Sequence, residues 1–71
     1  MNLLPNLKKA RMEIGLTQSE LAGRINPPVT AQSVSFWESG RRSPGLDILI
    51  QLSEILMKPI DYLVDRQNSV A

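Results

Sequence analysis

Three side chains that can bind the edges of DNA bases fall on one side of a short predicted helix: Gln32, Ser35 and Phe36. The helix is expected at residues 30–38, and steps of about 100° per residue put these three opposite Val34. A Gln amide can bond adenine N6 and N7 together, a Ser hydroxyl can donate or accept, and a Phe ring can contact a thymine methyl. A solvated Gln, and a Phe that packs in the core or at a dimer contact, are the alternatives.

Cationic side chains accompany this helix. Arg41 and Arg42 follow Gly40 at its exit, and Lys8 and Lys9 lie in the first predicted helix. Alone they would be an ordinary solvated basic surface. Next to a helix that enters a groove, such cations neutralise phosphates and make binding dependent on salt.

A capping box opens the second predicted helix. In Thr17-Gln18-Ser19-Glu20, the Thr17 side chain can accept from the backbone N–H of Glu20, whose own side chain reaches back. Backbone N–H groups and side chains at a helix start are common phosphate contacts. We therefore interpret Thr17 and Gln18 as phosphate contacts, with a plain surface Gln as the alternative.

A charge pair is expected inside the fold. Helical spacing puts Arg11 on the buried side of the first helix, where an unpaired charge is costly. Glu38 lies between the core side and the outer side of the third helix. The two residues are predicted to form a structural ion pair.

The only secondary-structure signals in the chain are helical, and no segment alternates like a strand. Pro5 suits a first helical position, Gly15 and Gly40 suit helix ends, and Asn26-Pro27-Pro28 must end a helix. We predict an all-α fold, a compact five-helix bundle whose second and third helices form a helix-turn-helix. Residues 1–64 form the domain and 65–71 a mobile tail. The helices are expected at 5–14, 17–25, 30–38, 46–57 and 59–64.

One small core accommodates the apolar stripes of these helices. Its predicted members are Leu7, Ile14, Leu16, Leu21, Ile25, Val29, Val34, Trp37, Leu46, Leu49, Leu52 and Leu56. The fourth helix is apolar over an arc of about 220°, against about 100° for a typical surface helix. The surplus is covered either by the last helix and tail or by a second subunit. The predicted dimer surface is Ile48, Leu52, Ile55, Ile60 and Val64.

Composition narrows the function classes. The chain has no Cys and no His, so a disulfide framework, a Cys/His zinc site and a His-dependent triad are excluded. No metal, cofactor or catalytic residue is predicted, and we expect no enzyme activity. No apolar run approaches the ~20 residues of a membrane span, so a cytoplasmic location without membrane contact is expected. Residues 1–45 carry a net charge of +3 and residues 46–71 one of −2, which suits one face on phosphates.

The order of many residues carries a family resemblance over about Leu7 to Leu63. They are Leu7, Arg11, Gly15-Leu16-Thr17-Gln18, Glu20-Leu21-Ala22, Val29, Val34, Glu38, Gly40-Arg41-Arg42, Pro44, Leu49, Leu52, Leu56 and Leu63. This pattern resembles the Cro and phage-repressor (XRE-like) helix-turn-helix family. The resemblance implies major-groove binding, usually as a homodimer on a palindromic operator. It implies a Gln18 that touches phosphate and buttresses the reading helix. It also implies base contacts at Ala31, Gln32, Ser33 and Phe36.

Two departures from the family pattern affect docking. The Asn26-Pro27-Pro28 turn is about two residues longer than usual, which predicts a shift in the angle between the two helices or in the contact at Ala31. Phe36 stands where a polar or basic reader is common. The predicted function is a sequence-specific transcriptional regulator, a repressor, on double-stranded DNA. The alternative is a protein-interaction module, such as an antitoxin-type partner, with or without DNA binding.

Overall fold

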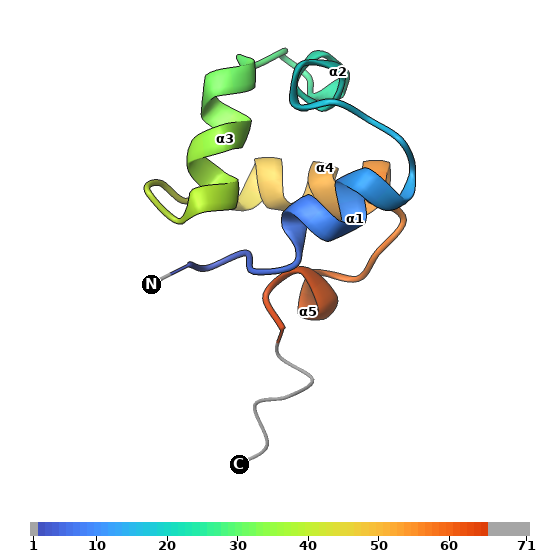
Figure 1. The fold of residues 1–71 in the computed structure, drawn as a ribbon, viewed down its shortest axis with the longest axis vertical. Coiled ribbons are helices and arrows are strands. Elements are labelled where there is room, and N and C mark those ends of the chain that lie inside the picture. Colours follow the sequence, from blue (N-terminus) through green and yellow to red (C-terminus); the bar gives the residue numbers. More distant parts are fainter. Residues whose placement is uncertain (1, 66–71) are drawn as a thin grey trace.

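The computed structural model describes residues 2–65 of the chain, and every regular element among them is a helix. The prediction of an all-α, five-helix fold is confirmed. Figure 1 shows the arrangement, with α2 and α5 at opposite ends of the bundle. The helices are α1 (Leu7–Glu13), α2 (Gln18–Arg24), α3 (Ala31–Ser39), α4 (Leu46–Leu56) and α5 (Ile60–Leu63).

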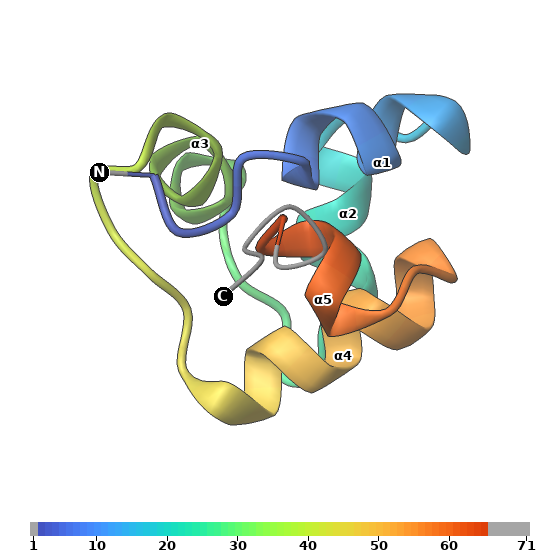
Figure 2. The same ribbon diagram turned by 90° about the horizontal axis from the view of Figure 1, so that it is seen from below.

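Helices α2 and α3 pack on each other as the predicted helix-turn-helix, α1 also packs on α3, and α5 packs on α4. Seen from below, α5 lies across α4 and close to the start of α1 (Figure 2). The side chain and backbone N–H groups of Asn6 donate to the carbonyls of Tyr62 and Leu63, at 2.8 and 3.4 Å. The start of α1 is thereby bonded to α5. Helix α1 therefore connects the helix-turn-helix, through its contact with α3, to the pair formed by α4 and α5.

Local capping signals fix the ends of α2 and α3. The Thr17 hydroxyl accepts from the backbone N–H of Glu20, whose carboxylate accepts from the backbone N–H of Thr17, which confirms the capping box. Hydrogen bonds with Thr17 lower the pKa of the Glu20 carboxyl below its ordinary value. The bond from the Thr17 backbone has the larger effect, and the bond with the Thr17 hydroxyl has the smaller one. Thr30 caps α3 as predicted, and Gly40 ends it in the left-handed region at φ 82°. Each side-chain cap contributes about 1 kcal/mol.

The core confirms most of the predicted list and corrects two members. Ile14 is 41% exposed and Leu46 is 70% exposed. Ile14 follows the last residue of α1, and the chain turns at Gly15, so that Leu16 is buried in its place. Leu46 is the first residue of α4, before the helix meets the core. The buried apolar residues are Leu4, Leu7, Ala10, Leu16, Leu21, Ala22, Ile25, Val34, Trp37, Leu52, Leu56 and Leu63, with Val29 and Leu49 partly buried against them.

Helix ends differ from prediction by at most two residues. The first helix begins at Leu7 rather than Pro5, because Leu4, two residues before Asn6, is drawn into the core instead. The fourth helix stops at Leu56, and Met57 adopts a left-handed conformation at φ 57°. Pro59 is the cap of α5 rather than its first residue. These shifts leave the order of elements unchanged.

The long turn between α2 and α3 is anchored to α4. The backbone N–H of Asn26 donates to Gln51 Oε1 at 2.8 Å, and Gln51 Nε2 donates to the carbonyl of Asn26 at 2.9 Å. The backbone N–H of Val29 donates to the carbonyl of Ala22 at 3.2 Å, which closes the turn. The two extra residues are therefore contained in a fixed loop, and α2 and α3 still pack directly.

The predicted tail starts at residue 65, and all but its first residue lies outside the described residues. Asp65 itself is half-buried and has φ 58°. The boundary at residue 64 stays a prediction. Within residues 2–65, none of the helices has both the length and the apolar character needed to cross a membrane.

Candidate nucleic-acid interface

A buried polar network joins α1, α2 and α3. Arg11 Nε donates to Glu38 Oε2 at 2.6 Å and its Nη2 to Glu38 Oε1 at 3.3 Å, which confirms the predicted ion pair. The pair is nearly inaccessible, with 9% of the Arg11 side chain and 6% of the Glu38 side chain exposed. Arg11 Nη1 also donates to the carbonyl of Leu16 at 2.7 Å. Both charges thus have the partners that burial demands.

Gln18 completes this network, a contact that sequence reasoning anticipated only as a general buttress. Gln18 Nε2 donates to Glu38 Oε1 at 3.0 Å, from the first residue of α2 to α3. An amide nitrogen carries two donors, so one remains for a phosphate. Asn2 Nδ2 donates to the Glu38 carbonyl at 2.9 Å and adds a link from the N-terminal segment. The C-terminal half of α3 is therefore fixed in position by directional bonds from three other segments.

The outer side of α3 carries the predicted base-reading residues at different exposures. Gln32 is exposed. Ala31 and Ser33 are half-buried, and the Ser33 hydroxyl lies 3.1 Å from the Thr30 hydroxyl. Trp37 is buried, as predicted. Gln32 is thus the most accessible of the predicted readers on α3.

Ser35 lies beside the polar network rather than with Gln32. A shallow hollow of about 230 Å³ brings together residues of α1, α2 and α3. Its lining consists of Lys8, Gln18, Ser35, Glu38 and Ser39. Lys8, Gln18 and Ser35 offer one cation, one amide and one hydroxyl here, beside a carboxylate already paired with Arg11, while the Ser39 hydroxyl donates to the Phe36 carbonyl. This donor set suits a phosphate oxygen.

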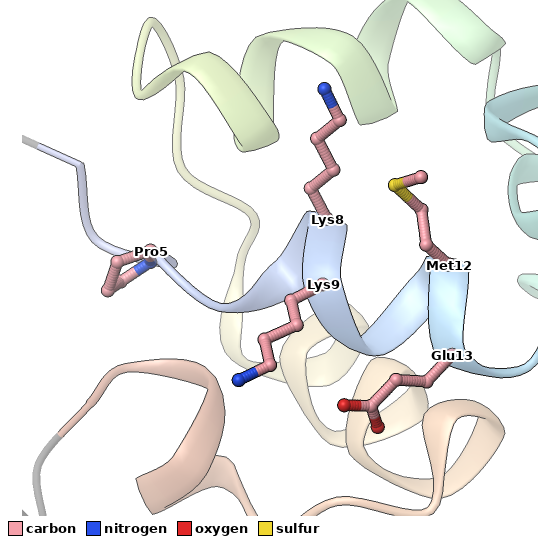
Figure 3. A pocket seen from close by; sticks show the side chains of 5 residues that line it. All are labelled: Pro5, Lys8, Lys9, Met12 and Glu13. Carbon is pink, nitrogen blue, oxygen red and sulfur yellow. The ribbon is translucent and has the colours of Figure 1, made fainter.

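The two predicted lysine contacts leave α1 in different directions. Lys8 points toward α3, whereas Lys9 points toward α5 (Figure 3). Both line a depression of about 590 Å³ along the exposed side of α1, together with Pro5, Met12 and Glu13. Glu13 is paired with Lys58 at 3.1 Å on that side. Lys8 is therefore better placed than Lys9 to meet the same ligand as Gln18.

The basic loop after α3 is held by one residue, Phe36. The backbone N–H groups of Arg41 and Arg42 donate to the Phe36 carbonyl at 2.9 and 3.3 Å, and that of Gly40 donates to it as well. The Ser39 hydroxyl donates to the same carbonyl at 3.2 Å. The Arg42 guanidinium lies over the Phe36 ring, 5.4 Å from its centroid. Both arginines are exposed.

The predicted dimer surface needs one correction. Leu52 has no exposed area, so it belongs to the core and offers nothing to a partner. Ile48, Ile55 and Val64 are partly buried and pack against the core, and Ile60 is half-buried. The most exposed apolar side chains of this segment lie on the other edge of α4 and are not among the predicted dimer residues: Leu46 at 70%, Ile50 at 44% and Met57 at 83%.

Nothing among residues 2–65 gathers three or more side chains of the types that could hold a metal ion. A family profile described as helix-turn-helix matches residues 7–63, which include all five helices. No solved structure matches the chain.

Two curated relatives match, both from Bacillus subtilis (strain 168). The HTH-type transcriptional regulator ImmR is 35% identical over 68 residues, which are 96% of this chain and 52% of that protein. The uncharacterized HTH-type transcriptional regulator YqaE is 34% identical over 64 residues, which are 90% of this chain and 53% of that protein. The chain spans about half the length of these relatives.

Proposed function

The chain belongs to the helix-turn-helix family of the Cro and phage-repressor (XRE-like) type, and on that premise we propose that it is a sequence-specific DNA-binding transcriptional regulator that acts as a repressor. One observation carries the proposal. The network of Arg11, Glu38 and Gln18 holds α3 in place while α3 presents Gln32 to solvent. A helix that reads bases must be fixed against its own domain and polar on the outside.

In the proposed complex, α3 lies in the major groove of double-stranded DNA. Gln32 makes the principal base contact, since its amide can pair with adenine N6 and N7. Ala31 and Ser33 lie on the same N-terminal turn of α3 and are proposed as nearby contacts. Ser35 and Phe36 lie one turn further along α3. At this position a side chain can contact either the DNA backbone or a base.

Phosphates are proposed to flank this helix on two sides. Lys8 and Gln18 serve one side through the hollow beside Glu38, with Thr17 next to Gln18 as the cap of α2. Arg41 and Arg42 serve the other side. Lys9 contributes at longer range. Each neutralised phosphate adds about 0.9 to the slope of log affinity against log salt concentration. The protein should therefore bind DNA much more weakly as salt rises.

We propose a homodimer on a palindromic operator, because one helix-turn-helix contacts too few base pairs for specificity. Half-sites would then lie about 34 Å apart, one helical turn. Helix α4 has two apolar edges on opposite sides of its core stripe: Ile48 and Ile55, which were predicted together with Ile60 and Val64, and the more exposed Leu46, Ile50 and Met57. We propose the exposed edge as the main contact between subunits and the predicted edge as its alternative. We also propose a cytoplasmic location and no enzyme activity.

Selection of bound sequences from random duplex DNA tests the proposal most directly. The expected result is a site with two inverted half-sites, bound more tightly than unrelated duplexes of equal length. Binding of every duplex alike would contradict sequence-specific regulation, and binding of none would contradict a DNA function.

The second candidate, a protein-interaction module of the antitoxin type, is favoured by the exposed apolar side chains Leu46, Ile50 and Met57. Such side chains mark protein contacts when they gather in one patch. Sedimentation distinguishes the candidates. Self-association that strengthens on the selected duplex supports the dimeric regulator, and a monomer that stays monomeric on DNA favours the module.

A further inference from the structure

We propose that Phe36 is a positioning residue, which holds the guanidinium of Arg42 ready for a DNA phosphate, and that it does not read a base itself. The inference rests on the proposed DNA binding and deepens it. It gives a role to Phe36, the residue of α3 that stands where the family commonly has a polar or basic reader.

The backbone around Phe36 supplies the first argument. Four donors converge on its carbonyl: the Ser39 hydroxyl and the backbone N–H groups of Gly40, Arg41 and Arg42. Gly40 allows this convergence because its φ of 82° reverses the chain at the end of α3. The first residues of the basic loop are thereby fixed relative to Phe36, before any side chain contributes.

The ring supplies the second argument. The Arg42 guanidinium lies over it, 5.4 Å from the ring centroid, within the distance at which a cation is attracted to an aromatic face. Among the described residues this contact belongs to Arg42 and not to its neighbour Arg41. A ring whose face is occupied by a guanidinium is less free to contact a thymine methyl. A held guanidinium, in contrast, loses less freedom when it binds phosphate.

Phe36→Leu tests the inference, with the duplex selected from random DNA and an unrelated duplex of equal length as probes. A cation–π contact at an exposed site contributes a factor of about two to five in an equilibrium constant. The Leu variant should therefore bind both duplexes two- to fivefold more weakly. Phe36→Tyr keeps an aromatic face and should bind like the unmodified protein.

Coupling to Arg42 provides the sharper measurement. In an Arg42→Ala background, Phe36→Leu should cost little further affinity, because the side chain that the ring holds is gone. In the matched Arg41→Ala background the full two- to fivefold loss should remain. In the free protein, the NMR signals of the Arg42 side chain should show a ring-current shift that disappears in Phe36→Leu.

Base reading by Phe36 would give different results. Replacing thymines of the selected duplex with deoxyuridine removes the methyl groups, and the unmodified protein should tolerate this without a loss attributable to Phe36. The inference is overturned if Phe36→Leu removes the effect of deoxyuridine, if its loss is confined to the selected duplex, or if it is equal in both arginine backgrounds. A gain in affinity would also overturn it, since the ring would then be withholding Arg42 from DNA.

Two controls keep these outcomes separate. Thermal unfolding of each variant shows whether the fold is intact. If Phe36→Leu does not fold, binding of the Arg42→Ala variant to the deoxyuridine duplex still tests base reading. If the unmodified protein binds neither duplex, the proposed function fails. If it binds and the coupling is absent, only the role of Phe36 fails.

Discussion

Helices α3 and α4 follow each other in the chain but are held by different kinds of interaction. In α3 only Val34 and Trp37 are buried. The helix is otherwise held by hydrogen bonds at the Thr30 cap, at the Gly40 end and at the Glu38 carboxylate. Directional bonds of this kind hold a helix in one orientation. That is the requirement for a side chain that must meet a base edge within a few tenths of an ångström.

Helix α4 shows the opposite arrangement. No side chain caps its start at Gly45, and it is held by apolar burial that includes Leu52 and Leu56. Other apolar side chains of this segment are exposed: Leu46 at 70%, Ile50 at 44% and, directly after the helix, Met57 at 83%. Burial has little directionality, so it supports a helix without fixing its orientation as hydrogen bonds do. The difference indicates that α3 is built to orient a polar surface and α4 to supply an apolar one.

The largest effect should come from breaking the ion pair that orients α3. Glu38→Ala strands Arg11 in a buried site and should lower the free energy of unfolding by about 3–5 kcal/mol. Arg11→Ala should cost a similar amount, and the double variant should lose less than the sum of the two. A double-mutant cycle on urea unfolding measures this coupling, and additive losses would contradict it.

The pair Glu13–Lys58 offers a matched control within the same domain. Its atoms lie 3.1 Å apart, but 42% of the Glu13 side chain and 31% of the Lys58 side chain are exposed. Solvent screens such a pair, so Glu13→Ala should change the free energy of unfolding by at most about 1 kcal/mol. If both pairs gave equal losses, burial would not be the reason that Glu38 matters.

Local and periodic signals made part of this network predictable. Thr17, Thr30 and Gly40 act on atoms within three or four residues, and short sequence patterns encode such contacts directly. Arg11 could be predicted because helical spacing put a charge on a buried side, and a buried charge requires a partner. The partner Glu38 could be named because its own helix offered one acidic residue near the core.

Contacts that depend on tertiary placement could not be predicted in this way. The bonds from Gln51 to the Asn26 backbone and the Arg42–Phe36 contact join segments whose separation in space no local pattern gives. Leu52 was expected in the core and at a partner surface at once, because periodicity gives a direction around the helix but not the depth of burial. Leu46 lies at the edge of the apolar arc of α4, on the same side as the exposed Ile50 and away from the buried Leu52 and Leu56.

The next effect tests the apolar surface of α4. Ile50→Glu puts a charge at an exposed position, so the fold should stay intact while dimerisation weakens. Two linked reading heads gain about a hundredfold or more over one, and this gain on the two-half-site duplex should be lost. Sedimentation and fluorescence anisotropy measure both changes. Affinity for a duplex with a single half-site should not change, and a loss there would mean that α4 contributes to the reading head itself.

Gln32 tests the polar side of the comparison. Gln32→Ala should cost roughly 1–3 kcal/mol of binding free energy on the selected duplex and little on unrelated DNA. Glu13→Ala, at an exposed position outside both α3 and the proposed dimer surface, should leave the preference between the two duplexes unchanged. Anisotropy titrations at one salt concentration give both values. Equal losses of Gln32→Ala on both duplexes would show that this side chain only contacts the backbone.

The smallest effect concerns Gln51, the residue through which α4 reaches the reading unit. Its amide both accepts from and donates to the backbone of Asn26, at 2.8 and 2.9 Å, and so connects the apolar helix to the turn that precedes α3. A hydrogen bond contributes about 0.5–1.5 kcal/mol net, and these two are exposed, so Gln51→Ala should lower the free energy of unfolding by about 1 kcal/mol.

Gln51→Glu is the matched variant for that test. It keeps the acceptor for the Asn26 N–H but loses the donor and places a carboxylate against the Asn26 carbonyl. It should therefore destabilise the turn at least as much as Gln51→Ala. Hydrogen exchange at the Val29 amide, which donates to Ala22 across the same turn, should accelerate in both variants while that of the Leu52 amide inside α4 changes less. Equal acceleration at both amides would mean that Gln51 supports α4 as a whole, and that the long turn is positioned by the packing of α2 on α3 alone.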